Sequence, residues 1–375
     1  MISNFGVADG GRETWAYNFI PRLLERWPGV TLDIVGLNRA GEHDNKPRLA
    51  ELLQGRGKVT FLRSERKRFP VLSMLRDAPR RLSGAKHPPP DVVIGVGSAV
   101  ELLVIRASPA FRRARKIVWL RTILADEKAR RLPKWLGRVL RTLEIPSLRS
   151  ADLLIANGED TAAYYRARGL KVAVIANGVD VQRWRCGSSP IGSPLRIAYV
   201  GRLIGEKGLV EFLTVAKRLH DGRQFEFHVV GEGPYAAEVR RAHDEGWVIH
   251  HGPKPNDEVP AALADFDVCV ALSFKSGQGG GGGVSNALLE QMAAGRVILA
   301  WRNETYGQLL DDANAFLVPQ GDVAALESVL KEIAADPEES RRRAEAAAGT
   351  AEGFSFEAHM DKFAALVEPL LARGR

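Results

Sequence analysis

Two successive series of short apolar strands alternate with helical patterns along this chain, and this alternation constrains the fold most strongly. The strands expected in the first series lie at 31–35, 58–62, 91–96, 116–120, 152–156 and 172–175. Those expected in the second series lie at 196–200, 226–230, 248–251, 268–272, 297–300 and 315–318. Because strands that alternate with helices form parallel sheets, the chain is predicted to be α/β, with two doubly wound Rossmann-like domains facing a cleft.

A segment rich in Gly, Ser and Pro, at 186–194, separates the two series and is the best linker candidate. It predicts an N-terminal domain at 1–187 and a C-terminal domain at 188–352, followed by a last helix within 353–375. A chain of 375 residues is long enough for two hydrophobic cores. The first strand is expected to be truncated, because only three residues precede the loop that begins at Asn4.

A glycine-rich loop at 277–283 runs from an apolar strand directly into a helix. This order brings free backbone N–H groups and the positive end of a helix dipole together. Glycine also lets the backbone approach a ligand closely. The loop is therefore a candidate binding site for a phosphate or pyrophosphate.

Two further loops follow expected strands, one around Gly10 and Gly11 and one at 201–208. Ligands of open α/β sheets bind beyond the carboxyl ends of the strands, so all three loops are expected to converge on one cleft. Arg202 and Lys207 add positive charge there, and together they would neutralise a diphosphate leaving group.

The charge of the chain is unevenly distributed. Residues 1–185 hold 34 Lys and Arg against 18 Asp and Glu, a net charge of +16, while the whole chain carries only +8. Basic amphipathic patterns at 63–81 and 130–143 fit an anionic membrane surface. They fit equally well a core-packed helix with a solvated basic face. No recognition motif supports nucleic acid as a partner.

The chain shows no signal peptide, and no apolar stretch approaches the roughly 18 residues that a spanning helix needs. Its two cysteines, Cys186 and Cys269, offer neither a disulfide framework nor the spacing of metal ligands. We therefore expect a cytoplasmic protein, or one peripheral to the inner face of the membrane, that binds no metal.

The motifs, in their order and spacing, resemble the retaining GT-B glycosyltransferases of family 4, also known as glycosyl transferases group 1. The segments 200–203, 206–208 and 230–234 are similar to the opening of that family's donor domain. The segment 284–295, Val-Ser-Asn-Ala-Leu-Leu-Glu-Gln-Met-Ala-Ala-Gly, is similar to its most characteristic helix. The resemblance covers nearly the whole chain.

The resemblance also implies roles for individual residues. Arg202 and Lys207 would hold the donor diphosphate, and Glu290 would bind the ribose hydroxyls. The other donor-binding candidates are Gly201, Gly282, Gly283, Val284 and Ser285. The acceptor-side candidates are Gly10, Gly11 and Arg121.

At two positions the chain departs from the family pattern. Gly282 stands where the family carries a second glutamate, eight residues before Glu290. Arg121 and Thr122 follow the strand at 116–120, where family members often carry a histidine.

The implied function is transfer of a sugar from a nucleotide sugar to a glycan or lipid-linked acceptor in cell-surface polysaccharide synthesis. The implied enzyme is a hexosyltransferase that needs neither a cofactor nor a metal, and its last helix would cross back onto the N-terminal domain. Two alternatives stay open. One is a nucleotide-sugar epimerase on the same fold, and the other is a catalytically weak nucleotide-sugar-binding or scaffold protein.

Overall fold

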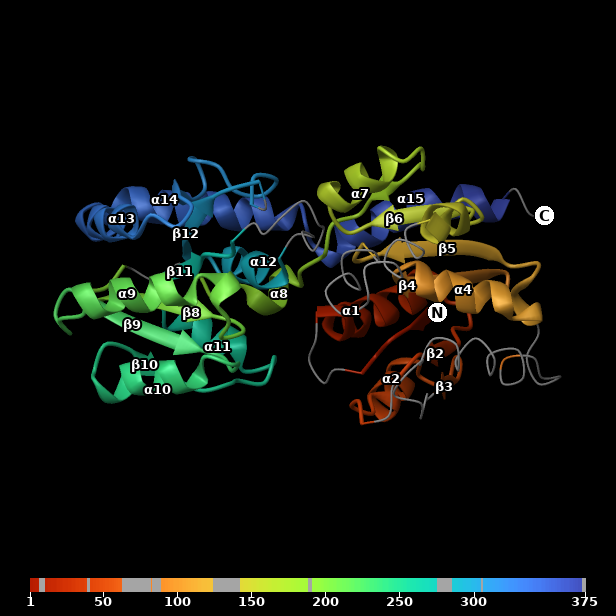
Figure 1. Cartoon of the computed structure of the whole chain (residues 1–375), viewed down its shortest axis with the longest axis horizontal. Helices are drawn as coiled ribbons and strands as arrows, with labels where there is room; N and C mark the ends of the chain where they lie inside the picture. The colour runs from red at the N-terminus through yellow and green to blue at the C-terminus, as the bar shows by residue number, and fades with distance from the viewer. Residues whose placement is uncertain are drawn as a thin grey trace. The chain divides into compact units, whose positions relative to one another are not determined.

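The structure is a computed structural model that describes residues 1–6, 11–38, 41–62, 82, 89–123, 142–187, 191–274, 285–304 and 306–372. The chain forms two compact units (Figure 1). The first unit holds Met1–Asn177 and Glu357–Arg375, and the second unit holds Gly178–Gly277 and Val284–Phe356. The domain boundaries at 187 and 352 that the sequence suggests stay predictions.

The first unit is built on a seven-stranded sheet with all-parallel pairing. Its strands are β1 (Ile2–Ser3), β2 (Ile34–Gly36), β3 (Val59–Phe61), β4 (Val92–Gly97), β5 (Arg115–Leu120), β6 (Leu153–Ala156) and β7 (Ala173–Val174). They lie side by side in the order β3-β2-β1-β4-β5-β6-β7. Its helices include α1 (Gly11–Arg26), α2 (Lys46–Leu52), α4 (Ala99–Ala107) and α7 (Glu159–Arg166).

The central strands of this sheet are apolar on both faces, as parallel strands covered by helices require. Ile117, Val118, Trp119 and Leu120 of β5 are all fully buried. β1 has only two residues, as the sequence predicts, yet it pairs with both β2 and β4 in the middle of the sheet.

The second unit is built on a six-stranded parallel sheet. Its strands are β8 (Leu195–Val200), β9 (Phe225–Val230), β10 (Ile249–His250), β11 (Val268–Ala271), β12 (Val297–Arg302) and β13 (Phe316–Pro319), in the spatial order β10-β9-β8-β11-β12-β13. Its helices are α8 (Val181–Trp184), α9 (Leu209–Leu219), α10 (Ala236–Asp244), α11 (Val259–Ala264), α12 (Asn286–Ala293), α13 (Val323–Ala335) and α14 (Pro337–Glu352). The predicted α/β class with two doubly wound sheets is confirmed.

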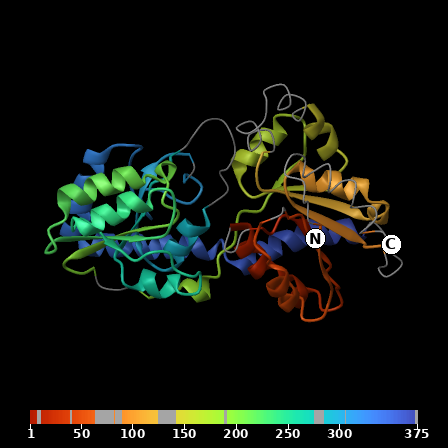
Figure 2. The ribbon, with the colours of Figure 1, turned by 60° about the horizontal axis from the view of Figure 1, so that its bottom comes forward.

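The last helix, α15 (Phe356–Ala372), packs into the first unit beside α1 (Figure 2). The indole N–H of Trp15 on α1 donates to His359 Nε2 at 3.1 Å. Phe363 stacks on Trp119 of β5, with ring centroids 5.4 Å apart. The hydrophobic core of the first unit is therefore completed by residues from the far end of the sequence.

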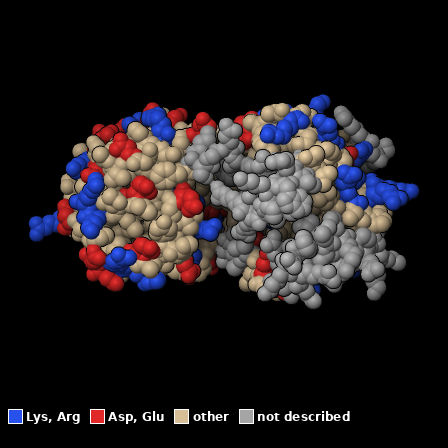
Figure 3. Space-filling view, in the orientation of Figure 1, with Lys and Arg blue, Asp and Glu red and all other residues tan. Residues whose placement is uncertain are grey.

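Among the described residues, no helix is both long and apolar enough to cross a membrane. Acidic and basic side chains are interspersed on the face of the second unit that Figure 3 shows. The basic segments at 63–81 and 130–143 lie almost wholly outside the described residues. The expected contact with an anionic membrane surface therefore stays a prediction.

Candidate functional site

The loops that follow β8 and β9 meet at the carboxyl edge of the second sheet. The backbone nitrogen of Gly201 donates to Val230 O at 3.0 Å, and that of Leu203 donates to Glu232 O at 3.0 Å. A Cβ atom on Gly231 would lie 1.9 Å from Gly201 O, closer than side-chain carbons come to backbone oxygens. Gly231 also has a φ of +145°. Glycine is therefore required here for the two loops to approach each other.

The loop that follows β11 joins the same edge. Phe274 N donates to Glu206 O at 2.9 Å, which ties this loop to the short 3-10 turn η2 (Gly205–Lys207). Gly208 ends that turn with a φ of +71°, and a Cβ atom on it would lie 2.4 Å from Leu272 O. Three loops from three neighbouring strands thus converge. The glycine-rich loop itself, 277–283, lies outside the described residues.

Arg202 and Lys207 are brought onto this edge by the loop after β8. Arg202 is exposed and Lys207 is half-buried. Burial lowers the pKa of the Lys207 ammonium, and the neighbouring Arg202 guanidinium lowers it further. Within the described part of the chain, neither side chain forms an ion pair. Two adjacent positive charges therefore have no negative partner among the described residues.

Helix α12 follows the glycine-rich loop, and Ser285 is its N-cap. The Ser285 hydroxyl accepts from Leu288 N at 3.4 Å, which satisfies one free amide of the first turn. The neighbouring candidates Gly282, Gly283 and Val284 lie outside the described residues, so their roles stay predictions.

Glu290 lies on α12, one turn beyond its start. The side chain is half-buried, and burial raises the pKa of its carboxyl group to about 7. Arg183 of α8 acts in the opposite direction and favours the charged form. No sequence motif pointed to Arg183, because it lies more than 100 positions before Glu290 in the chain. A carboxyl group poised near neutral pH is typical of binding and catalytic sites.

The acceptor-side candidates belong to the first unit. Gly10 lies outside the described residues, and Gly11 is the exposed first residue of α1. Arg121 directly follows β5, and its backbone nitrogen donates to Gly97 O at 2.8 Å. Burial lowers the pKa of its guanidinium to about 9.

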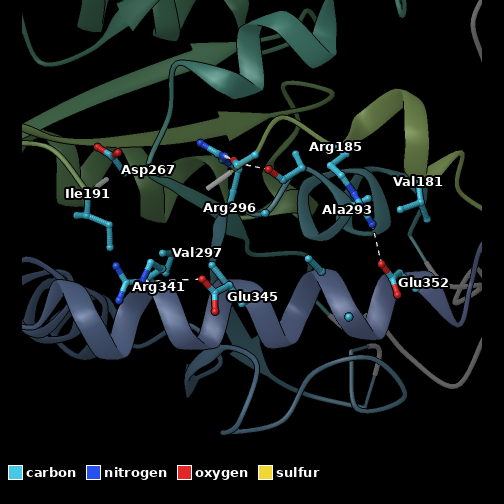
Figure 4. A pocket seen from close by; sticks show the side chains of 16 residues that line it. Val181, Arg185, Ile191, Asp267, Ala293, Arg296, Val297, Arg341, Glu345 and Glu352 are labelled. Atoms are coloured by element: carbon cyan, nitrogen blue, oxygen red, sulfur yellow. Dashed lines mark hydrogen bonds and ion pairs between the residues drawn. The ribbon is translucent and has the colours of Figure 1, made fainter. Parts of the chain in front are cut away.

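A cavity of about 320 Å³ lies at the opposite edge of the second sheet, where β11 and β12 begin (Figure 4). Asp267 and Arg296 line one side of it, and Arg341 of α14 lines the other. Arg185 and Glu352 form an ion pair at its rim, with a nitrogen–oxygen distance of 2.7 Å. None of the described site candidates lines this cavity, so it is separate from the converging loops.

The described residues contain no cluster of three His, Cys, Asp or Glu side chains that could hold a metal.

Two doubly wound parallel sheets, with cationic loops at the carboxyl edge of the second sheet, are typical of the class of GT-B glycosyltransferases. The family model for glycosyltransferase family 4 matches residues 9–183, and the model for glycosyl transferases group 1 matches residues 194–336. Together the two models match most of the chain. The chain belongs to this glycosyltransferase family.

Curated relatives share about a third of their residues with the chain in the matched segments. A candidate colanic acid biosynthesis glycosyltransferase of Escherichia coli is 31% identical over 189 residues, which is 48% of this chain and 46% of the relative. A 2-deoxystreptamine N-acetyl-D-glucosaminyltransferase of Streptomyces fradiae is 29% identical over 64% of this chain and 51% of the relative. The matches therefore span about half the length of these relatives.

Solved structures match the chain over nearly its whole length. The sucrose-phosphate synthase of Thermosynechococcus elongatus has a TM-score of 0.74 at 17% identity, covering 99% of this chain and 98% of that one. HepE of Anabaena, solved with UDP and glucose, has a TM-score of 0.73 at 17% identity, covering 98% of both chains. At this identity the likeness establishes the fold.

Proposed function

We propose that the protein is a retaining glycosyltransferase of the hexosyltransferase type, which moves a sugar from a nucleotide diphosphate sugar to a glycan or lipid-linked acceptor. The pair Arg202 and Lys207 is the observation that supports this most. Their charges have no negative partner in the described part of the chain, and they lie beside three converging loops. A donor diphosphate would supply the missing negative charge.

In the proposed reaction, the bond between the anomeric carbon and the diphosphate oxygen breaks, and its electron pair leaves with the diphosphate. Arg202 and Lys207 stabilise the negative charge that develops there. The acceptor hydroxyl forms the new bond from the face that the leaving group vacates and passes its proton to the departing diphosphate oxygen, so the anomeric configuration is retained. Because both charges come from side chains, we propose that the reaction needs no metal and no cofactor.

The biological setting is also a proposal. The colanic acid relative supports a role in cell-surface polysaccharide synthesis. The UDP and glucose bound to HepE make uridine diphosphate sugars the first donors to test. The net charge of +16 on residues 1–185 supports work at the anionic inner face of a membrane, where lipid-linked acceptors are found.

Calorimetry with a panel of nucleoside diphosphates and nucleotide sugars tests the proposal. We expect one base to bind, and Arg202→Ala and Lys207→Ala each to weaken that binding by roughly tenfold or more, since each removes a charge-assisted hydrogen bond. The bound nucleotide sugar should release its nucleotide when membrane extract supplies an acceptor, and excess EDTA should leave that rate unchanged.

Arg240→Ala and Lys331→Ala are matched controls, because both side chains are exposed on helices of the second unit. Nucleotide binding that is equally strong in the Arg202 and Lys207 variants would contradict the proposal. Release of nucleotide without any acceptor would instead indicate an epimerase or a hydrolase. Binding without release would indicate a nucleotide-sugar-binding protein.

A further inference from the structure

Arg121 is held in a defined position at the carboxyl edge of the first sheet. Its backbone nitrogen is bonded to Gly97 of the neighbouring strand β4, and its Nη2 donates to Asn177 Oδ1 at 2.9 Å. Its guanidinium lies 5.2 Å from the centre of the Trp15 ring. The backbone bond therefore fixes the main chain of Arg121, and the Asn177 amide and the Trp15 ring orient its guanidinium.

One nitrogen of this guanidinium has no hydrogen-bond partner among the described residues. Nη1 is buried, and no hydrogen-bond acceptor among the described residues reaches it. The Arg121 side chain as a whole is only half-buried, so part of it stays accessible to a ligand. An unpaired buried donor is costly, and more so when it is charged. An arginine does not escape this cost by losing its proton.

The charges around Arg121 do not remove this cost. Arg12, in the first turn of α1, lies close enough to lower the pKa of Arg121, while Glu13 acts in the opposite direction. The side chain of Glu101 is used to cap helix α4, where it accepts a hydrogen bond from Ser98 N at 2.7 Å. It is therefore not the partner of Arg121 Nη1. The amino end of α1 adds the positive end of a helix dipole to the two arginines.

We propose that Arg121 binds an oxyanion, a carboxylate or a phosphate, on the substrate that occupies the first unit. The planar guanidinium fork matches the geometry of both groups. This inference rests on the proposed function, which supplies an acceptor substrate. It narrows the acceptor to an acidic class, either a glycan that carries an acidic sugar or one that carries a phosphate.

The test is a titration of the full chain, first saturated with the nucleoside diphosphate that binds best, so that the donor site is occupied. Inorganic phosphate and glucuronate are added separately, and glucose serves as the neutral counterpart of glucuronate. Chemical-shift changes in NMR spectra give the affinities. We expect at least one of the two anions to bind, and to bind more tightly than glucose does. The anion that binds identifies the carboxylate or the phosphate source.

In Arg121→Gln the affinity for that anion should fall roughly tenfold or more, and in Arg121→Lys it should fall less. Gln keeps a hydrogen-bond donor near Asn177, and circular dichroism of both variants checks that they fold. Arg113→Gln is the matched control, because Arg113 is exposed in the same unit. Anion binding by Arg121→Gln at the wild-type affinity, or no anion binding by the wild type at millimolar concentrations, overturns the inference.

The two proposals fail separately. If no nucleoside diphosphate binds, the proposed donor site is wrong, and the same anion titration on the chain without nucleotide still tests Arg121. If the nucleotide binds and abolishes phosphate binding, the anion site is part of the donor site, and the acidic acceptor is excluded.

Discussion

Glu290 carries a carboxyl group whose burial opposes its charge. Because burial raises its pKa to about 7, the protonated form persists in the folded chain well above the ordinary carboxyl range. The stability that this residue contributes is therefore present at low pH and is lost as the pH rises through 7. The ionised form, which accepts hydrogen bonds most strongly, is fully populated only above neutrality.

We expect donor affinity to follow this ionisation. If the Glu290 carboxylate holds the ribose, affinity for the nucleotide sugar should rise between about pH 6 and about pH 8 and then level off. A nucleotide sugar is the right probe, because it lacks the terminal phosphate ionisation near pH 6 that would add its own pH dependence. Calorimetry at a series of pH values measures the profile.

In Glu290→Gln, the pH dependence should disappear, and affinity above neutral pH should fall roughly tenfold. Glu245→Gln is the matched control, since Glu245 is exposed at the end of α10. A pH profile that is the same in Glu290→Gln and in the wild type would show that this carboxyl group does not govern donor binding.

At the scale of elements, helix α15 contributes side chains to the hydrophobic core of the first unit. Phe363 is 1% exposed and packs against Phe19, Trp27 and Trp119. His359 bonds through both ring nitrogens, to Trp15 and to Ala176 O. A helix from the end of the chain thus fills the space between α1 and β5.

Phe363→Ala should destabilise the first unit by about 3–5 kcal/mol, because it leaves a large cavity in a packed aromatic cluster. Chemical denaturation followed by tryptophan fluorescence measures this, since Trp15 and Trp119 lie in the cluster. Leu371→Ala on the same helix is the control. Leu371 is 37% exposed, so its truncation should change the stability by less than about 0.5 kcal/mol. Equal effects of the two substitutions would contradict this account of α15.

At the scale of the whole molecule, each unit has its own sheet and its own buried core. We therefore expect the two units to respond separately to a ligand. A nucleoside diphosphate should slow amide hydrogen exchange in β8, α12 and the other elements of the second unit that surround the donor loops, because binding stabilises only the state that binds.

Hydrogen exchange monitored by mass spectrometry measures this response peptide by peptide, with the nucleotide-free protein as the reference. Protection confined to the second unit would agree with the donor site proposed here. Protection that is equal in the cores of both units would mean that they unfold as one cooperative body.

Much of the fold and part of the candidate site follow from local sequence. The apolar strands, the helical periods between them and the glycines that follow strands are local patterns, and the structure confirms the parallel α/β class that they predict. The same patterns place Gly201, Arg202 and Lys207 directly after β8, at the edge where neighbouring loops meet. These features can be predicted from the sequence because backbone geometry and the periodicity of apolar side chains are set by a few neighbouring residues.

Other features depend on contacts between distant parts of the chain, and only the tertiary structure decides them. The pKa of Glu290 follows from burial and from Arg183. The guanidinium of Arg121 has one nitrogen that no described residue pairs with, because of its place between Trp15 and Asn177. Arg296 belongs to none of the sequence motifs described above, yet it is buried and donates to Phe266 O at 2.9 Å and to Ala294 O at 3.0 Å. Burial and partner geometry are properties of the packed chain, so a single sequence determines where charges occur but leaves their environment undetermined.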